Sequence, residues 1–122
     1  MRSKKITVRF SARLKAEMQE AVIRAGYGFH GKSKWLSEAV TLFLQQSNYI
    51  DFVEHCIDIN QADLRTVEAF YVDIESHKKI KNALVDVRMK YPLFEGVQSA
   101  LIRSCVVFRL VFNKIPPGGK FR

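Results

Sequence analysis

A short stretch of alternating basic and apolar side chains, Lys4 to Phe10, stands directly in front of a helical pattern near the start of the chain. Successive side chains of a strand point to opposite sides, so the apolar residues can enter a core while the residues between them project from the other face. The inward positions are Ile6, Val8 and Phe10, and the outward positions are Lys5, Thr7 and Arg9. Such a strand has one apolar face and one face suited to an anionic ligand.

Two helical patterns follow this strand. Ser11 is a suitable N-cap, and apolar residues recur on one side of a helix over residues 12–25. Glycines then stop the pattern, and a second helix is expected after Ser33, another candidate N-cap. The apolar face of this second helix, residues 35–44, is so wide that the β-α-α unit needs a partner of similar shape.

The partner is predicted in the same chain, because the order of patterns recurs. A shift of 62 positions aligns the first strand and helix with a later segment and places Ser11 on Asp73. A shift of 66 positions then aligns the second helices and places Trp35 on Leu101. Few residues are identical between the two segments, so what recurs is the order of strand, cap and helix patterns.

These patterns predict one compact domain over residues 1–122. Its segments are a first β-α-α unit (4–48), an acidic connector (49–65), a second β-α-α unit (66–112) and a flexible basic tail (113–122). The prolines and glycines of the tail cannot extend a helix. Residues 106–112 are β-prone and could form a strand, whereas the repeat favours a buried helix there.

The positive charge is concentrated in the first unit. The chain has a net charge of +8, and residues 1–48 carry nine Lys and Arg against three Asp and Glu. Residues 49–122 carry eleven against nine. An anionic partner is expected, and nucleic acid is the commonest one for a small basic protein.

Several other classes of protein are disfavoured by the sequence. The two cysteines, Cys56 and Cys105, are far apart and have no spaced histidines nearby, so neither a disulfide framework nor a metal site is expected. No nucleophile stands beside a base, and no glycine-rich phosphate loop occurs, so we expect no catalytic residues and no cofactor. Because a long apolar run and a secretory leader are also missing, we expect a cytoplasmic protein without a membrane partner.

The first unit resembles the ribbon-helix-helix (MetJ/Arc-type) family of DNA-binding proteins. The resemblance is carried by Lys5 to Phe10, the capped helix, the glycine-containing turn and the run from Gly31 to Val40. The second unit has lost the glycine turn and matches through Asp73 and residues 100–106. Two units in one chain are similar to the single-chain members found as accessory proteins of conjugative plasmids and T-DNA transfer.

The resemblance implies a mainly α fold with a two-stranded antiparallel β-ribbon, built as a tandem ribbon-helix-helix pseudo-dimer in one chain. In this family the ribbon enters the major groove of double-stranded DNA, and the start of the second helix faces a phosphate. The outward positions of the second strand are then Val67, Ala69 and Tyr71. The implied DNA-binding residues are Lys4, Lys5, Thr7, Arg9, Ala69, Tyr71, Ser33 and Lys34.

Each of these assignments has a simpler alternative. The outward row of the first strand can be an ordinary solvated face, Tyr71 can cover apolar surface, and Ser33 can serve only as a helix cap. For the biological role, the resemblance favours an accessory factor in transfer or processing of a mobile element, acting with further copies on adjacent sites or with a relaxase-type partner. The alternatives are a transcriptional repressor and an antitoxin-like protein-interaction module.

Overall fold

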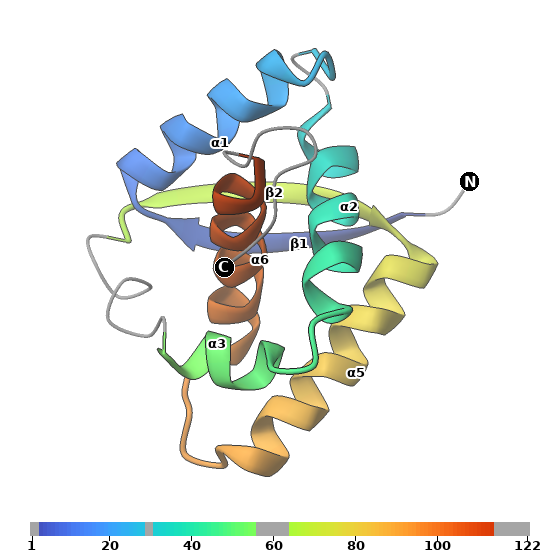
Figure 1. The fold of residues 1–122 in the computed structure, drawn as a ribbon, viewed down its shortest axis with the longest axis vertical. Coiled ribbons are helices and arrows are strands. Elements are labelled where there is room, and N and C mark those ends of the chain that lie inside the picture. The colour runs from blue at the N-terminus through green and yellow to red at the C-terminus, as the bar shows by residue number, and fades with distance from the viewer. Residues whose placement is uncertain (1–2, 29–30, 56–63, 114–122) are drawn as a thin grey trace.

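The chain folds into two strands and a set of helices, seen in a computed structural model that describes residues 3–28, 31–55 and 64–113 (Figure 1). The elements, in order, are β1 (Ser3–Phe10), α1 (Ala12–Arg24), α2 (Lys32–Leu44), α3 (Tyr49–His55), β2 (Thr66–Asp73), α5 (Ile74–Lys90) and α6 (Val97–Asn113). The expected mainly helical fold with one two-stranded antiparallel sheet is therefore confirmed. Residues 106–112 belong to a helix, as the repeat predicts.

The two strands form a ribbon with one buried face and one open face. They pair antiparallel over their whole length, from Ser3 opposite Asp73 to Phe10 opposite Thr66. Burial alternates along both strands, as a period of two requires. The rings of Phe10 and Phe70 meet beneath the ribbon with their centroids 6.0 Å apart. The inward positions are Ile6, Val8, Phe10, Glu68, Phe70 and Val72.

Two central helices cover the buried face of the ribbon. Helices α2 and α6 pack against each other and run in opposite directions, with α1 and α5 on opposite sides of this pair (Figure 1). Helix α2 lies against β2, and α6 lies against β1, so each helix covers the strand of the other half of the chain. Trp35, Leu36, Leu101 and Ile102 are fully buried in the resulting core. Neither half of the chain buries its apolar surface alone.

Side chains from the central helices also satisfy backbone groups at the two free edges of the ribbon. The backbone N–H of Tyr71 donates to Ser33 Oγ at 2.9 Å. On the other strand, Arg103 Nη1 donates to the carbonyl oxygen of Arg9 at 2.8 Å. An exposed strand edge is a template for pairing with other chains, and these bonds occupy part of each edge.

Glu68 is an acidic residue on the buried face of the ribbon, and two lysines from the first half of the chain neutralise it. Its two carboxylate oxygens lie 3.1 Å from Lys32 Nζ and 3.2 Å from Lys15 Nζ. The Glu68 side chain is only 7% exposed, so its charge needs these partners. The ion pairs thereby join β2 to α1 and to the start of α2.

The acidic connector contains a helix that was not predicted from the sequence. Helix α3 buries Val53 and stacks the Phe52 ring edge-on against Phe43, with a centroid distance of 5.3 Å. The segment is only two turns long, too short for a helical period to stand out. Residues 56–63 of the connector and 114–122 of the predicted tail lie outside the described residues.

Hydrogen bonds to α5 hold α3 in place. Asp51 accepts from Lys90 Nζ at 2.6 Å and from the Tyr91 hydroxyl at 2.9 Å, and both bonds lower the pKa of the Asp51 carboxyl. The Tyr49 hydroxyl donates to Asp86 at 3.0 Å. Burial together with this carboxylate raises the pKa of Tyr49 to about 12. The connector is therefore part of the packed domain at its helical end.

Each β-α-α unit has a predicted N-cap before its first helix, and only one of the two makes a side-chain cap hydrogen bond. Ser11 caps α1 as expected, because its hydroxyl accepts from the backbone N–H of Leu14 at 3.1 Å. Asp73 occupies the matching position before α5, but its side chain makes no cap hydrogen bond. Gly26, with φ of +83°, follows the C-cap of α1 in the left-handed conformation that glycine adopts without strain.

Candidate nucleic-acid interface

The open face of the ribbon carries two rows of side chains. We call Lys5, Thr7 and Arg9 on β1 the polar row, and Val67, Ala69 and Tyr71 on β2 the apolar row. The strand register sets these residues directly opposite one another. The cross-strand pairs are Lys5 with Tyr71, Thr7 with Ala69, and Arg9 with Val67.

Both rows are accessible from solvent. All three residues of the polar row are exposed. In the apolar row, Val67 and Tyr71 are 52% and 56% exposed, and Ala69 is half-buried between them. Neither Lys5 nor Arg9 forms an ion pair with any residue that the structure describes. Their donors are therefore available to a ligand that approaches this face.

Lys4 lies outside both rows. It is exposed and pairs with Val72 near the end of the ribbon. The alternation of a strand places Lys4 on the same side as Ile6 and Val8, which is the side covered by helices. A ligand that contacts the open face meets Lys4 only at the end of the ribbon.

The start of α2 differs from the expected one. The helix begins at Lys32, and the carbonyl of Gly31 accepts from the backbone N–H of Trp35, so Gly31 is the cap residue. The prediction that Ser33 caps this helix is therefore wrong. The Ser33 hydroxyl instead bonds to the backbone of Tyr71, which connects the helix start to the apolar row. Because the cap residue Gly31 has no side chain, it provides no side-chain cap for the first backbone N–H groups of α2.

The basic residues at this helix start have different environments. Lys32 is engaged with the buried Glu68, so its charge is already balanced within the protein. Lys34 is exposed, and its Nζ lies 5.8 Å from the centroid of the Tyr27 ring. Lys34 is therefore the cation beside the α2 N-terminus that can meet an external anion. The start of α6, near Ser99, carries no basic side chain; its first turn follows Gly96.

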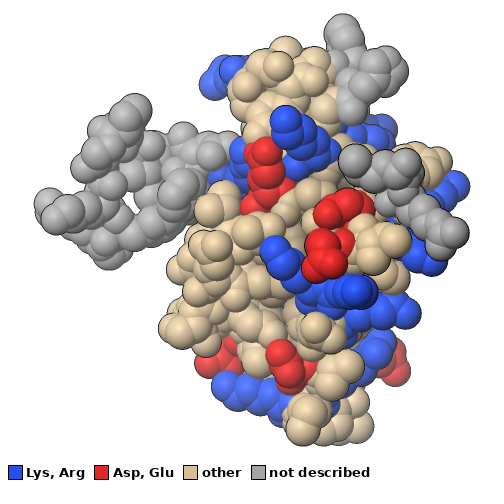
Figure 2. All heavy atoms as spheres, turned by 90° about the vertical axis from the view of Figure 1, so that its right-hand side faces the viewer, with Lys and Arg blue, Asp and Glu red and all other residues tan. Residues whose placement is uncertain are grey.

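Positive charge is not uniform over the whole surface. On the side of the molecule drawn in Figure 2, Lys and Arg side chains are interspersed with Asp and Glu. Ion pairs such as Arg24–Glu20 and Lys90–Asp51 balance some of the surface cations. The two rows on the open face of the ribbon, in contrast, contain two cations and no acidic side chain.

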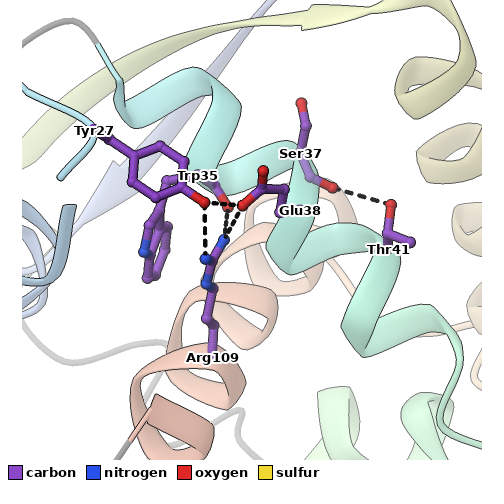
Figure 3. A network of polar contacts seen from close by, with 6 residues as sticks. All are labelled: Tyr27, Trp35, Ser37, Glu38, Thr41 and Arg109. Carbon is purple, nitrogen blue, oxygen red and sulfur yellow. Dashed lines mark hydrogen bonds and ion pairs between the residues drawn. The ribbon is translucent and has the colours of Figure 1, made fainter. Parts of the chain in front are cut away.

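A buried arginine on α6 connects the α2 start to the core (Figure 3). Arg109 Nη1 donates to the carbonyl oxygen of Trp35 at 2.6 Å and to Glu38 at 3.2 Å. Its guanidinium lies 4.6 Å from the centroid of the Trp35 ring. Tyr27, from the turn before α2, donates its hydroxyl to the same Glu38 carboxylate. These contacts hold the turn, the first part of α2 and α6 together.

The hydrogen bond from Tyr27, reinforced by Arg109, lowers the pKa of the Glu38 carboxyl below its ordinary value of 4.5. Burial opposes this shift but does not outweigh it. Glu38 is therefore ionised at neutral pH and balances the charge of Arg109.

We also searched the described residues for a metal site, a reactive thiol and a membrane-spanning helix. They contain no group of three or more His, Cys, Asp or Glu side chains that could hold a metal ion. Cys105 is fully buried, and burial raises the pKa of its thiol, which opposes formation of a nucleophilic thiolate. None of the described helices has the length and apolar character needed to cross a bilayer. Cys56 and His30 lie outside the described residues.

Two buried arginines on which this surface depends were not predicted from the sequence. Arg103 and Arg109 are buried and bond to the backbone of β1 and α2, respectively. The sequence signal for them is two arginines within the largely apolar stretch from residue 100 to 111, a pattern that indicates buried polar partners. Val67, an outward position expected from the sequence, stands opposite Arg9 in the apolar row.

No family model matches the chain, and neither a curated protein nor a solved structure matches it.

Replacing Arg109 with Met should destabilise the fold. The change removes the Arg109 hydrogen bond to the Trp35 carbonyl and leaves Glu38 without the arginine's counter-charge, and we expect the free energy of unfolding to fall by about 2 kcal/mol. Urea unfolding followed by circular dichroism measures this loss. Arg13→Met removes an arginine whose side chain is 88% exposed and should cost less than about 0.5 kcal/mol. Equal losses in the two variants would contradict the structural role of Arg109.

The Glu38 carboxylate should make stability depend on acid pH. Because its folded pKa is lowered, its contribution is present above the ordinary pKa and is lost as pH falls toward the folded value. Between about pH 6 and about pH 3, wild type should therefore lose more unfolding free energy than Glu38→Gln. Urea unfolding at a series of pH values tests this difference. Glu95→Gln, a change at an exposed carboxylate outside the network, should keep the wild-type profile.

Proposed function

We propose that this protein binds double-stranded DNA by placing the open face of the β-ribbon in the major groove. The supporting observation is the pair of exposed rows, held in register on one face of a two-stranded ribbon whose other face is covered by helices. The major groove is about 12 Å wide and admits a two-stranded ribbon. The helices that the structure describes leave both rows exposed, so none of them has to move for the ribbon to approach DNA.

The polar row supplies suitable donors for base edges. The guanidinium of Arg9 can donate two hydrogen bonds to guanine O6 and N7, and Lys5 can donate to the same acceptors. Thr7, between them, can bond to a base or contact a methyl group. Each good contact discriminates against the wrong base by about 1–3 kcal/mol.

The start of α2 supplies a contact for the sugar-phosphate backbone. Its first backbone N–H groups lack a side-chain cap, and the helix dipole adds positive charge there. Lys34 adds a full positive charge on the exposed side. Since the Ser33 hydroxyl joins this helix start to the backbone of β2, a phosphate bound here would fix the position of the ribbon in the groove.

We further infer that the two β-α-α segments form a ribbon-helix-helix pseudo-dimer within one chain. The 62-position shift that relates the two segments in sequence converts Thr7 into Ala69, and these two residues face each other across the ribbon. An approximate two-fold axis would therefore pass between them. The exchange of partners, with α2 on β2 and α6 on β1, agrees with this arrangement.

The proposed cellular role is that of an accessory factor in DNA transfer or processing. A ribbon completed within one chain requires no second subunit, so a single molecule can mark a site for a processing enzyme. One ribbon covers only a few base pairs, and further copies on adjacent sites or a relaxase-type partner would supply additional affinity. Repression of transcription is the alternative use of the same binding.

Removing both cations of the polar row should weaken DNA binding strongly. For Lys5→Ala/Arg9→Ala, we expect at least about a 30-fold loss of affinity, because two base contacts of roughly 1 kcal/mol or more disappear. Gel-shift titration on a duplex selected from a random pool measures the loss.

A matched control removes the same charge from another surface. Lys81→Ala/Arg88→Ala changes two exposed cations of α5, outside the ribbon face, and should reduce affinity by about threefold or less, since distant charges are screened. If both double variants lost affinity equally, general charge attraction would explain the binding and the ribbon assignment would fail.

The single-chain ribbon also predicts the stoichiometry of binding. Light scattering of the DNA-free protein should give the mass of one chain, 14.1 kDa. On a minimal duplex of about one helical turn, roughly 10 base pairs, the complex should contain one chain per duplex. Two chains on that duplex would show that the ribbon is completed between molecules, against the pseudo-dimer.

A further inference from the structure

The apolar row is an unusual surface for a solvated ribbon. Strands that face water commonly carry charged side chains, especially lysine, which prevent association through the exposed sheet. Val67 and Tyr71 are instead more than half exposed, with Ala69 between them. The row lies beside the polar row and faces the same side, so a ligand that contacts Lys5 and Arg9 also meets these apolar side chains.

We propose that the apolar row recognises the C5-methyl groups of thymine in the major groove, so that the protein binds an asymmetric site in a single orientation. This inference rests on the proposed binding of DNA through the ribbon. Thymine is the only standard base that presents a methyl group in the major groove, and apolar side chains are its matching partners. Val67 and Ala69 have no side-chain donor or acceptor, so an apolar contact is the only base contact they can make.

The spacing of the row suits this ligand. Outward side chains of a strand are two residues apart, which is about 6.8 Å along an antiparallel strand. Two base-pair steps of about 3.4 Å span the same length. Successive residues among Val67, Ala69 and Tyr71 can therefore meet bases about two steps apart. Tyr71 can cover a methyl group with its ring while its hydroxyl bonds to a neighbouring acceptor.

The register makes the readout directional. Each cross-strand pair combines one polar-row residue with one apolar-row residue, as Arg9 with Val67 shows. Donors to guanine therefore lie along β1, whereas methyl contacts lie along β2. A palindromic site would present the same bases to the polar row and to the apolar row. Only one of the two rows would then meet bases that suit its side chains. The preferred site should be rich in guanine on one side and in thymine on the other.

The test changes the DNA and leaves the protein intact. A duplex is first selected from a random pool with the full chain, and each thymine is then replaced by uracil, which lacks only the methyl group. Fluorescence anisotropy should show about a fourfold loss of affinity for each contacted methyl, the equivalent of one buried methyl-sized group. Replacements at thymines outside the contact region should change nothing, which provides an internal control.

Protein variants then assign the contact. Val67→Ser and Tyr71→Ser, tested singly, should bind the thymine duplex more weakly and lose the effect of uracil at their own positions. Val85→Ser/Met89→Ser, which alters two exposed apolar residues of α5, should keep the full sensitivity to uracil.

The outcomes separate this inference from the proposed function. Tight binding of the selected duplex with equal affinity for thymine and uracil forms would overturn methyl recognition and leave DNA binding intact. A selected site that is palindromic would overturn the single orientation. Uracil effects that persist unchanged in both serine variants would show that other residues contact the methyl groups. If no duplex were enriched or bound, the proposed DNA-binding function itself would fail.

Discussion

The pairing of β1 with β2 is the interaction on which the rest of this structure depends. The strands come from opposite halves of the chain, and an isolated two-stranded ribbon is at best marginally stable in water. Here the ribbon gains stability because α2 and α6 cover its inner face and pack on each other. In return, the ribbon brings the two halves together, since each central helix lies on the strand of the other half. Strand pairing and helix packing are thus one cooperative unit.

Polar side chains inside this unit join particular elements. Glu68 forms ion pairs with two lysines of the first half, and Arg103 and Arg109 extend from α6 to backbone carbonyls of β1 and α2. Burial lowers the pKa of Arg103, which reflects the cost of removing a guanidinium from water. A buried charge is tolerated only where partners are in place, so these contacts favour one arrangement of the elements over others that bury similar apolar area.

A ribbon made from two different strands of one chain can have two chemically different rows. In a symmetric homodimer both strands are identical, so each row repeats the other. Here β1 carries Lys5, Thr7 and Arg9, whereas β2 carries an apolar set at the facing positions. The proposed asymmetric DNA site follows from this difference. Two strands within one chain can differ in sequence in this way, whereas the strands of a homodimer cannot. The start of α2 near Lys34, which belongs to the first half of the chain, would then add a contact to the sugar-phosphate backbone of the DNA.

Features that depend on near neighbours were predictable from the sequence. The period of two in Lys4 to Phe10 identified a strand and the side on which each residue lies, and Ser11 and the apolar periodicity identified α1. The recurrence of this pattern also identified the second strand, and it favoured a helix over the alternative of a strand for residues 106–112. These properties follow from backbone geometry, which repeats over two or about 3.6 residues and is visible in any short window.

Contacts between distant elements were not predictable in the same way. The bond from Tyr71 to Ser33, the neutralisation of Glu68 by Lys15 and Lys32, and the packing of α3 each join residues far apart in the chain. A serine before a helix looks like a cap whether or not a strand edge is near it, and a lysine looks solvent-exposed until a buried carboxylate is placed beside it. The partner of a polar group is chosen when the elements assemble, because the cost of leaving that group unpaired arises only once water has been excluded.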